Sequence, residues 1–308
     1  MTRTFYIFNH QGKGDEFEST LLKAGYTKTD LLNAQVVLTD IDAPGRIVRM
    51  RAQLESRYTK LFCYPHAARP FIGWDGLFPP SEHTSASFVF TEGHIEVIRA
   101  YGYKKPLHAV GWLYCPITPF TPCTEVRRVL FAPIHPNANG FLSTLDKQIN
   151  HDTYAALLRL VQTEKIDLTV RHLQSLASGG LWQDKRVRYV PGYRNTNQIN
   201  DIADADLVVS HQTFAFMAVA SGKPTLMMAE FQAPRNGGDP QSFQCVRSWE
   251  KYRQLLAYPL DILNTPDVWA LMRRAGETDD DIFDWRNRMI GEKTFDPHIF
   301  LNELESYL

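Results

Sequence analysis

The sequence has little cysteine, no excess of charge of either sign and no long hydrophobic run. Its 4 cysteines among 308 residues stand far apart without a C-x-x-C pair, so neither a zinc knuckle nor a disulfide scaffold is indicated. The net charge of -1 gives no overall basic field for holding nucleic acid or an anionic membrane. No stretch approaches the ~20 apolar residues of a membrane span, and the N-terminus has no apolar core of the kind that a signal peptide needs. We therefore expect a cytoplasmic protein without a transmembrane segment.

What the sequence has instead is a regular alternation of short apolar runs with amphipathic stretches. This pattern is typical of βα units around a parallel sheet, so we expect an α/β protein. The expected strands cover residues 4–8, 34–40, 60–65, 86–91, 107–112, 128–134, 167–173, 186–192, 206–210 and 224–230. The expected helices cover residues 15–24, 45–57, 93–101 and 151–163, and the tail from residue 246 onward is expected to be helical.

Three prolines indicate a linker near the middle of the chain. Pro116, Pro119 and Pro122 cannot lie in a central strand or a helix interior, and the alternation restarts after them. A chain of 308 residues also exceeds the usual length of one compact domain. We expect two Rossmann-like domains facing across a cleft, because ligands of such folds bind at the carboxyl ends of the strands. The expected ranges are 1–120 for the first domain, 121–280 for the second, and 281–308 for C-terminal helices that pack back on the first.

A polar corner separates an apolar strand from an apolar helix in "DLVVSHQTFAFMAVASGKP". Ser210, His211, Gln212 and Thr213 stand together there. The helix is expected to start near Thr213, and from Phe214 onward it is so apolar that it must be buried. The N–H groups at a helix start and the helix dipole bind anions such as a diphosphate. The alternative is plain helix capping, which needs only one short polar side chain. Four polar residues in a row favour the anion site.

Three segments carry a resemblance to a known group of enzymes. They are "IADADLVVSHQTFAFMAVASGKPTLMM" (202–228), "RRVLFAPIHP" (127–136) and "FVFTEGHIEVIRAYGYKKPLHAVGW" (88–112). The first resembles the donor-site segment of GT-B glycosyltransferases, which cradles the diphosphate of a sugar nucleotide. "RRVLFAPIHP" is similar to the start of the C-terminal domain in the CDP-glycerol glycerophosphotransferase group, and the segment at 88–112 resembles the one before the interdomain linker. The resemblance is one of pattern and spans about residues 86–230.

The resemblance implies a metal-independent GT-B enzyme that uses a nucleotide diphosphate sugar as donor substrate and no further cofactor. Two differences from the pattern of these enzymes concern the residues that would bind the donor. Many such sites have a carboxylate early in the helix after the polar corner, to hold the ribose hydroxyls; this helix has none, and Glu230 would have to substitute. The glycerophosphotransferase group has an Arg-x-His-Pro-like element, where this chain has "VRHLQ", with Arg171 and His172 adjacent and no proline.

Loops after other strands of the second half add candidate donor contacts. His135 follows the strand at 128–134, and Tyr193 and Arg194 follow the strand at 186–192. A tyrosine ring can stack on a nucleotide base and an arginine can pair with phosphate, although both loops could be ordinary connections. The full expected donor set is His135, Arg171, Tyr193, Arg194, Ser210, His211, Gln212, Thr213, Phe214 and Glu230.

The catalytic base is expected after the first strand. A transferase must remove a proton from the acceptor hydroxyl, and histidine titrates near neutral pH. His10 occupies the loop where inverting GT-B enzymes often have a base. Asp15 is the rival, although a carboxylate at a helix start is more often a cap.

An aromatic loop after the third strand is expected on the acceptor side. It contains His66, Arg69, Trp74 and Asp75, which would suit a sugar or an extruded base by stacking and hydrogen bonding; the alternative is a packed surface loop. The Asp-x-Asp of "LTDID" could hold a divalent cation, but the two-domain pattern and the following turn residues argue against it. We expect no metal site.

The expected function is therefore transfer of a sugar, or a related group, from a nucleotide diphosphate donor to a hydroxyl acceptor. The acceptor could be a glycan or wall polymer, or a hydroxymethylated base in DNA, as in phage DNA glycosyltransferases; in that case the protein would work in the host cytoplasm. Near-neutral charge argues mildly against DNA. The alternatives are a sugar-nucleotide epimerase or hydrolase of the same fold, and a non-catalytic nucleotide-binding protein. The sequence does not indicate the oligomeric state.

Overall fold

The computed structural model describes residues 3–8, 14–39, 59–64, 84–100, 103–134, 144–172, 184–191, 198–228, 267–277 and 279–308. Contacts between residues divide the chain into two compact units. Of the described residues, unit 1 holds those up to Tyr114 and those from Asn287 onward, and unit 2 holds those from Cys115 to Arg286. The predicted domain ranges, with boundaries after residues 120 and 280, stay predictions.

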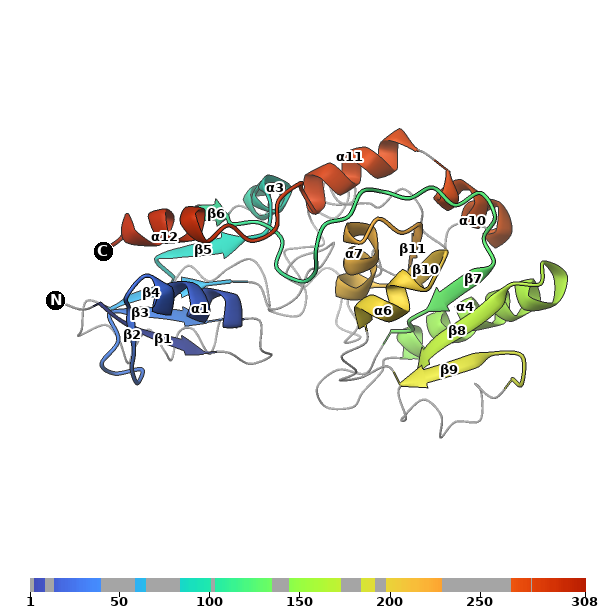
Figure 1. Cartoon of the computed structure of the whole chain (residues 1–308), viewed down its shortest axis with the longest axis horizontal. Coiled ribbons are helices and arrows are strands. Elements are labelled where there is room, and N and C mark those ends of the chain that lie inside the picture. Colours follow the sequence, from blue (N-terminus) through green and yellow to red (C-terminus); the bar gives the residue numbers. More distant parts are fainter. Residues whose placement is uncertain are drawn as a thin grey trace. The chain divides into compact units, whose positions relative to one another are not determined.

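Unit 1 is built on a six-stranded sheet in the order β2-β1-β3-β4-β5-β6 (Figure 1). Its strands are β1 (Thr4–Phe8), β2 (Thr27–Lys28), β3 (Val36–Thr39), β4 (Lys60–Cys63), β5 (Ala86–Val89) and β6 (Leu107–Ala109). All neighbouring pairs are parallel, and the register places Phe5 beside Val36 and Val36 beside Lys60. The apolar runs of the sequence thus form the centre of the sheet, where β3 and β5 are buried throughout.

Helices α1 (Asp15–Lys23) and α12 (Pro297–Glu305) pack on one face of this sheet. Phe17 of α1, Phe300 of α12 and Phe88 of β5 meet in one buried cluster, with the Phe17 and Phe88 rings each 4.9 Å from the Phe300 ring. The chain passes from β5 through α3 (Glu92–Ala100) to β6, toward one edge of the sheet. From β1 it passes through α1 to β2, toward the opposite edge. Because such crossovers are right-handed, α3 covers the other face.

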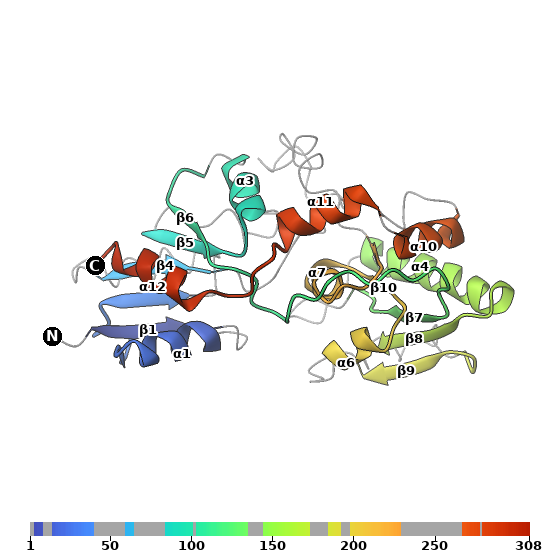
Figure 2. The ribbon, with the colours of Figure 1, turned by 45° about the horizontal axis from the view of Figure 1, so that its top comes forward.

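Unit 2 is built on a five-stranded parallel sheet in the order β11-β10-β7-β8-β9. Its strands are β7 (Arg128–Phe131), β8 (Asp167–His172), β9 (Arg188–Pro191), β10 (Leu207–Ser210) and β11 (Thr225–Met227). Its helices are α4 (Thr144–Thr163), α6 (Gln198–Ala203), α7 (Gln212–Ala220) and α10 (Val268–Gly276), and α11 (Asp280–Met289) leads the chain back to unit 1 (Figure 2). The strand order reverses between β7 and β10, as in a doubly wound fold.

The apolar helix α7 lies in the core of unit 2. All its residues from Ala215 to Ala220 are buried, and the Phe216 ring contacts the Trp285 ring of α11 at 5.0 Å. The Gly-Lys-Pro that follows has a structural role. Gly222 has φ of 73°, which favours glycine, and Lys223 donates to the carbonyl oxygens of Ala203 and Ala205 at 2.7 and 2.8 Å, at the end of α6.

The expected α/β class with two Rossmann-like parallel sheets is confirmed. The expected strands are present but mostly shorter, and the two-residue β2 was not expected. Helix α4 begins at Thr144 rather than at residue 151, and the helix expected at 45–57 lies outside the described residues. No helix in the described ranges combines the length and the apolar character that crossing a bilayer requires.

Candidate functional site

The strand order of unit 2 defines where a ligand should bind. Connections leave β7 and β10 in opposite directions, so a crevice opens outside their carboxyl ends. Phe131 ends β7 and Ser210 ends β10, and the ladder between the two strands continues to a bond from the Ala132 N–H to the Val209 carbonyl at 2.9 Å. The candidate site consists of the residues that follow these two ends.

Helix α7 begins directly after β10, at Gln212. His211 is its N-cap residue, with extended backbone (φ -138°, ψ 163°), and it makes no side-chain cap bond. The first helical bond runs from the Ala215 N–H to the His211 carbonyl at 3.3 Å. In an α-helix that begins at Gln212, the N–H groups of the first turn come before this first bond of the helical series. The helix thus begins one residue earlier than the sequence suggested.

Ser210 has a hydrogen-bond partner inside the protein. Its side chain is fully buried, and Oγ donates to the Ala132 carbonyl at 3.0 Å, so it joins the ends of β10 and β7. Its expected contact with a donor phosphate stays a prediction. His211 is also buried, with 4% of its surface exposed.

Asn150 of α4 is a buried polar residue that sequence reasoning missed. Its amide holds both backbone groups of Ile134, three residues after the end of β7. The signal was an asparagine on the inward face of an amphipathic helix, where Ile149, Thr153 and Leu157 are also buried. The helix expected from the sequence begins at residue 151, so this asparagine falls just before it.

Arg171 lies near the carboxyl end of β8 and is buried, with 3% of its surface exposed. Its guanidinium forms an ion pair with Asp201 of α6, and its Cζ lies 5.2 Å from the ring centroid of Phe214 in the first turn of α7. Burial lowers the pKa of Arg171, against the opposing effect of Asp201. An arginine nevertheless keeps its charge in proteins, so a buried positive charge lies beside the start of α7.

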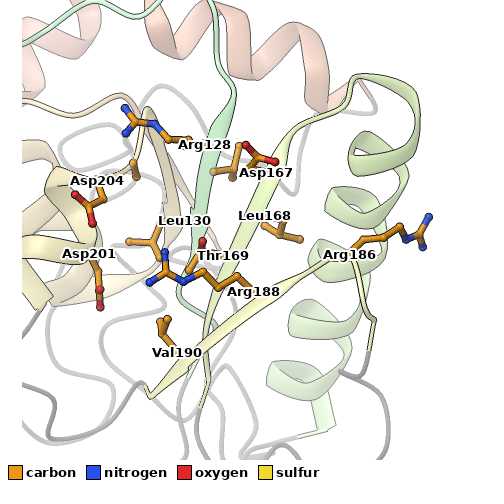
Figure 3. Close-up of a pocket in the computed structure, with 12 residues that line it drawn as sticks. Arg128, Leu130, Asp167, Leu168, Thr169, Arg186, Arg188, Val190, Asp201 and Asp204 are labelled. Carbon is orange, nitrogen blue, oxygen red and sulfur yellow. The ribbon is translucent and has the colours of Figure 1, made fainter.

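A cavity of about 420 Å³ lies elsewhere in unit 2, over the face of the sheet (Figure 3). It is lined by the first residues of β7 and β8, by β9 and by α6, so it lies toward the amino ends of β7 and β8. Its charged side chains have both signs, and Figure 3 shows Arg186 turned away from the other labelled residues. Asp201 lines this cavity and also pairs with Arg171.

The structure brings together only part of the expected site. Ser210, His211, Thr213, Phe214 and Arg171 lie around the carboxyl ends of β8 and β10. Asp15 belongs to unit 1, where it is the exposed first residue of α1. The remaining expected residues lie outside the described ranges: His10, His66, Arg69, Trp74, Asp75, His135, Tyr193, Arg194 and Glu230. Gln212 is described through its backbone only.

No protein-family model matches the chain, and no curated protein matches its sequence. Solved structures do match. A protein from Listeria monocytogenes assigned as a UDP-N-acetylglucosamine 2-epimerase superposes with a TM-score of 0.51 at 13% identity, over 99% of this chain and 95% of its own. The UDP-GlcNAc 2-epimerase of Methanocaldococcus jannaschii, solved with UDP-GlcNAc and UDP, gives 0.49 at 9% identity, over 96% and 80% of the two chains. Acinetobacter baumannii MurG gives 0.47 at 9% identity, over the full length of both. The first likeness shows the fold, which is of the GT-B type expected from the sequence.

Proposed function

We propose that this protein is a metal-independent GT-B glycosyltransferase that moves a sugar, or a related group, from a nucleotide diphosphate donor to a hydroxyl acceptor. The observation that carries the proposal is the start of α7. It lies at the point where the strand order reverses between β7 and β10, which is where doubly wound sheets bind nucleotides. A helix start there offers backbone N–H groups and the positive end of a dipole to a diphosphate.

The chemistry requires this arrangement because the diphosphate leaves with additional negative charge. Fixed donors that need no reorganisation stabilise such a leaving group best. The first-turn N–H groups of α7 are fixed by the buried helix, and Arg171 adds a positive charge 5.2 Å from the Phe214 ring. In this proposal His135, Tyr193, Arg194 and Glu230 complete the donor site.

The acceptor half of the proposal rests on the sequence. His10 or Asp15 removes the proton from the acceptor hydroxyl, and His66, Arg69, Trp74 and Asp75 bind the acceptor. The acceptor is a glycan or wall polymer, or a hydroxymethylated DNA base. Supplying each acceptor type with a labelled sugar nucleotide and following transfer of the label distinguishes them.

A sugar-nucleotide 2-epimerase is the second candidate, and the likeness in fold to the Listeria monocytogenes protein favours it. Incubation with a panel of nucleotide sugars and no acceptor separates the two. An epimerase yields an altered sugar still joined to its nucleotide, whereas a transferase releases nucleoside diphosphate slowly. A protein that binds a nucleotide but gives neither product is a binding protein, and the proposal is then wrong.

The α7 site is tested by removing one backbone donor. In Gln212→Pro the first helical residue loses its N–H, yet proline suits this position, and the extended backbone of His211 suits the residue before a proline. We expect affinity for UDP, CDP, ADP or GDP, whichever the parent binds best by calorimetry, to fall about tenfold or more.

Gln212→Ala is the matched control, since it removes the same side chain and keeps the N–H. The difference in affinity between the alanine and the proline variants isolates the backbone donor. Equal affinities in two folded variants would remove the start of α7 from the donor site.

A further inference from the structure

Asn150 makes two hydrogen bonds to one residue. Its Oδ1 accepts from the Ile134 N–H at 2.8 Å, and its Nδ2 donates to the Ile134 carbonyl at 2.8 Å. Both residues are buried, with 1% and 0% of their surfaces exposed. The amide of Asn150 therefore pairs with the backbone as a neighbouring strand would.

This pairing begins where the sheet ends. The Ala132 N–H makes the last bond to β10, at 2.9 Å to the Val209 carbonyl, and Ile134 is two residues further along. A buried backbone N–H or C=O without a partner is destabilising, so both groups of Ile134 need a partner in this position. Asn150 supplies it for both.

The same short segment is held from the opposite side. The Ala132 carbonyl accepts from the Ser210 hydroxyl at 3.0 Å, and Ser210 directly precedes His211, the N-cap residue of α7. Residues 132–134 are thus fixed to α4 through Asn150 and to the start of α7 through Ser210. These contacts set the spacing of the two backbones that border the crevice between β7 and β10.

Packing alone does not account for an asparagine here. Asparagine forms helices poorly and its amide must be desolvated, so a leucine would pack better on α4 but would leave both backbone groups of Ile134 without a partner. The gain from the amide lies in pairing these two groups, which also fixes the place of Ile134.

We propose that Asn150 is a positioning residue for the donor diphosphate: it does not contact the donor, but holds residues 132–134 at the spacing from the start of α7 that the diphosphate requires. This inference rests on the proposed function, since it needs the crevice to bind a nucleoside diphosphate. It adds α4, which lies outside the expected site, to the elements that determine donor affinity.

Asn150→Asp distinguishes a positioning role from a purely structural one. At about pH 8 the carboxylate can accept from the Ile134 N–H, but its second oxygen faces the Ile134 carbonyl without a proton to donate. Burial raises the pKa of such a carboxyl, so near pH 5.5 it takes up a proton and presents the same acceptor and donor as the amide. We expect affinity for the parent's best nucleoside diphosphate to fall about tenfold at the higher pH and to recover toward the parent's value at the lower pH.

Each affinity is compared with that of the parent at the same pH, because the diphosphate itself titrates in this range. Thr153→Val is the matched control. Thr153 is a second buried polar residue of α4, one turn further on, whose hydroxyl has no partner among the described residues. Its removal should leave the affinity unchanged at both pH values.

The measurement is made well below the melting temperature of each variant, with folding checked by circular dichroism. If Asn150→Asp does not fold, Asn150→Ser serves instead: its shorter side chain loses the paired bonds to Ile134, so the affinity should fall at both pH values. Folded variants that bind as tightly as the parent at both pH values would overturn the inference alone. A parent that binds none of the four diphosphates would overturn the proposed function, and this inference with it.

Discussion

Arg171 carries its charge at a position where only 3% of its surface is exposed, and Asp201 is its carboxylate partner. Removing one member of a buried ion pair leaves the other charge uncompensated, which costs about 3–5 kcal/mol. The Asp201 side chain is 18% exposed, so the lower end of that range applies. Asp201→Asn should lower the free energy of unfolding of unit 2 by about 3 kcal/mol, as measured by urea denaturation.

The control for this prediction is an exposed pair in the same unit. Arg127 and Glu125 are 76% and 80% exposed at the side chain, so Glu125→Gln should change the unfolding free energy by less than about 1 kcal/mol. If Asp201→Asn costs no more than Glu125→Gln, the ion pair does not compensate a buried charge, and Arg171 is stabilised by its other surroundings.

Candidate site residues could be predicted from the sequence, but few of their hydrogen-bond partners could. Ser210, His211 and Thr213 were predictable as a group because they follow an apolar strand and precede an apolar helix. The hydrogen bond from the Ser210 hydroxyl to the Ala132 carbonyl could not be predicted, because this contact depends on β7 lying beside β10. Asn150 was missed for the same reason: its partner is the backbone of Ile134, 16 residues away, which carries no residue-specific signal.

Helix α12 presents two neighbouring apolar residues to different surroundings. Phe300 is fully buried among the rings of Phe17 and Phe88, whereas Ile299 is 37% exposed. Truncating a buried phenylalanine removes apolar contacts and leaves a cavity, at a cost of about 3–5 kcal/mol. Phe300→Ala should therefore lower the unfolding free energy of unit 1 by that amount.

Ile299→Ala is the matched control for Phe300→Ala and should cost less, since 37% of the Ile299 surface is already exposed to solvent. The comparison is made by thermal or urea unfolding under the same conditions. Equal costs for the two variants would mean that α12 does not dock on the sheet through Phe300.

Elements were predictable where the pattern was strong and local. Apolar runs identified the positions of β3 and β10, because a strand buried on both faces needs no polar alternation. The length of β7 was overestimated, since residues after its end, such as Ala132 and Ile134, are apolar and buried as well. The first turns of α4 and the two-residue β2 lack a clear period, so local pattern could not indicate them.

At the scale of the whole molecule, the chain forms two units with separate cores. Among the described residues, those from Asn287 onward belong to unit 1 with those up to Tyr114, so the C-terminal residues stabilise the first unit rather than the one that precedes them in sequence. A protein of this kind need not unfold in a single step, and each unit then has its own transition. Predictions about stability therefore refer to one unit.

His94 makes the stability of unit 1 depend on pH. It is buried in α3, where its Nδ1 is 2.9 Å from the Thr91 Oγ1 and its ring lies 5.2 Å from the Phe90 ring. Burial lowers the pKa of His94 to about 3, whereas an unfolded chain has a histidine pKa near 6.5. Burial also lowers the pKa of His108, against the opposing effect of Glu303, so its contribution has the same sign.

Between about pH 6.5 and pH 3 the unfolded chain thus binds a proton at position 94 that the folded chain does not bind. The free energy of unfolding must fall as the pH falls through this window, by up to about 1.4 kcal/mol per pH unit, and it is insensitive to His94 above the window.

His94→Asn places an amide near Thr91 without a titrating group. This variant should flatten the fall in unit 1 stability between about pH 6.5 and pH 4.5, measured as melting temperature or urea midpoint. Ile98→Val, in the same helix, should lower stability by about 1 kcal/mol at every pH and keep the slope. If His94→Asn keeps the full slope of the parent, His94 takes up a proton in the folded state, and the acid sensitivity of unit 1 arises from other groups.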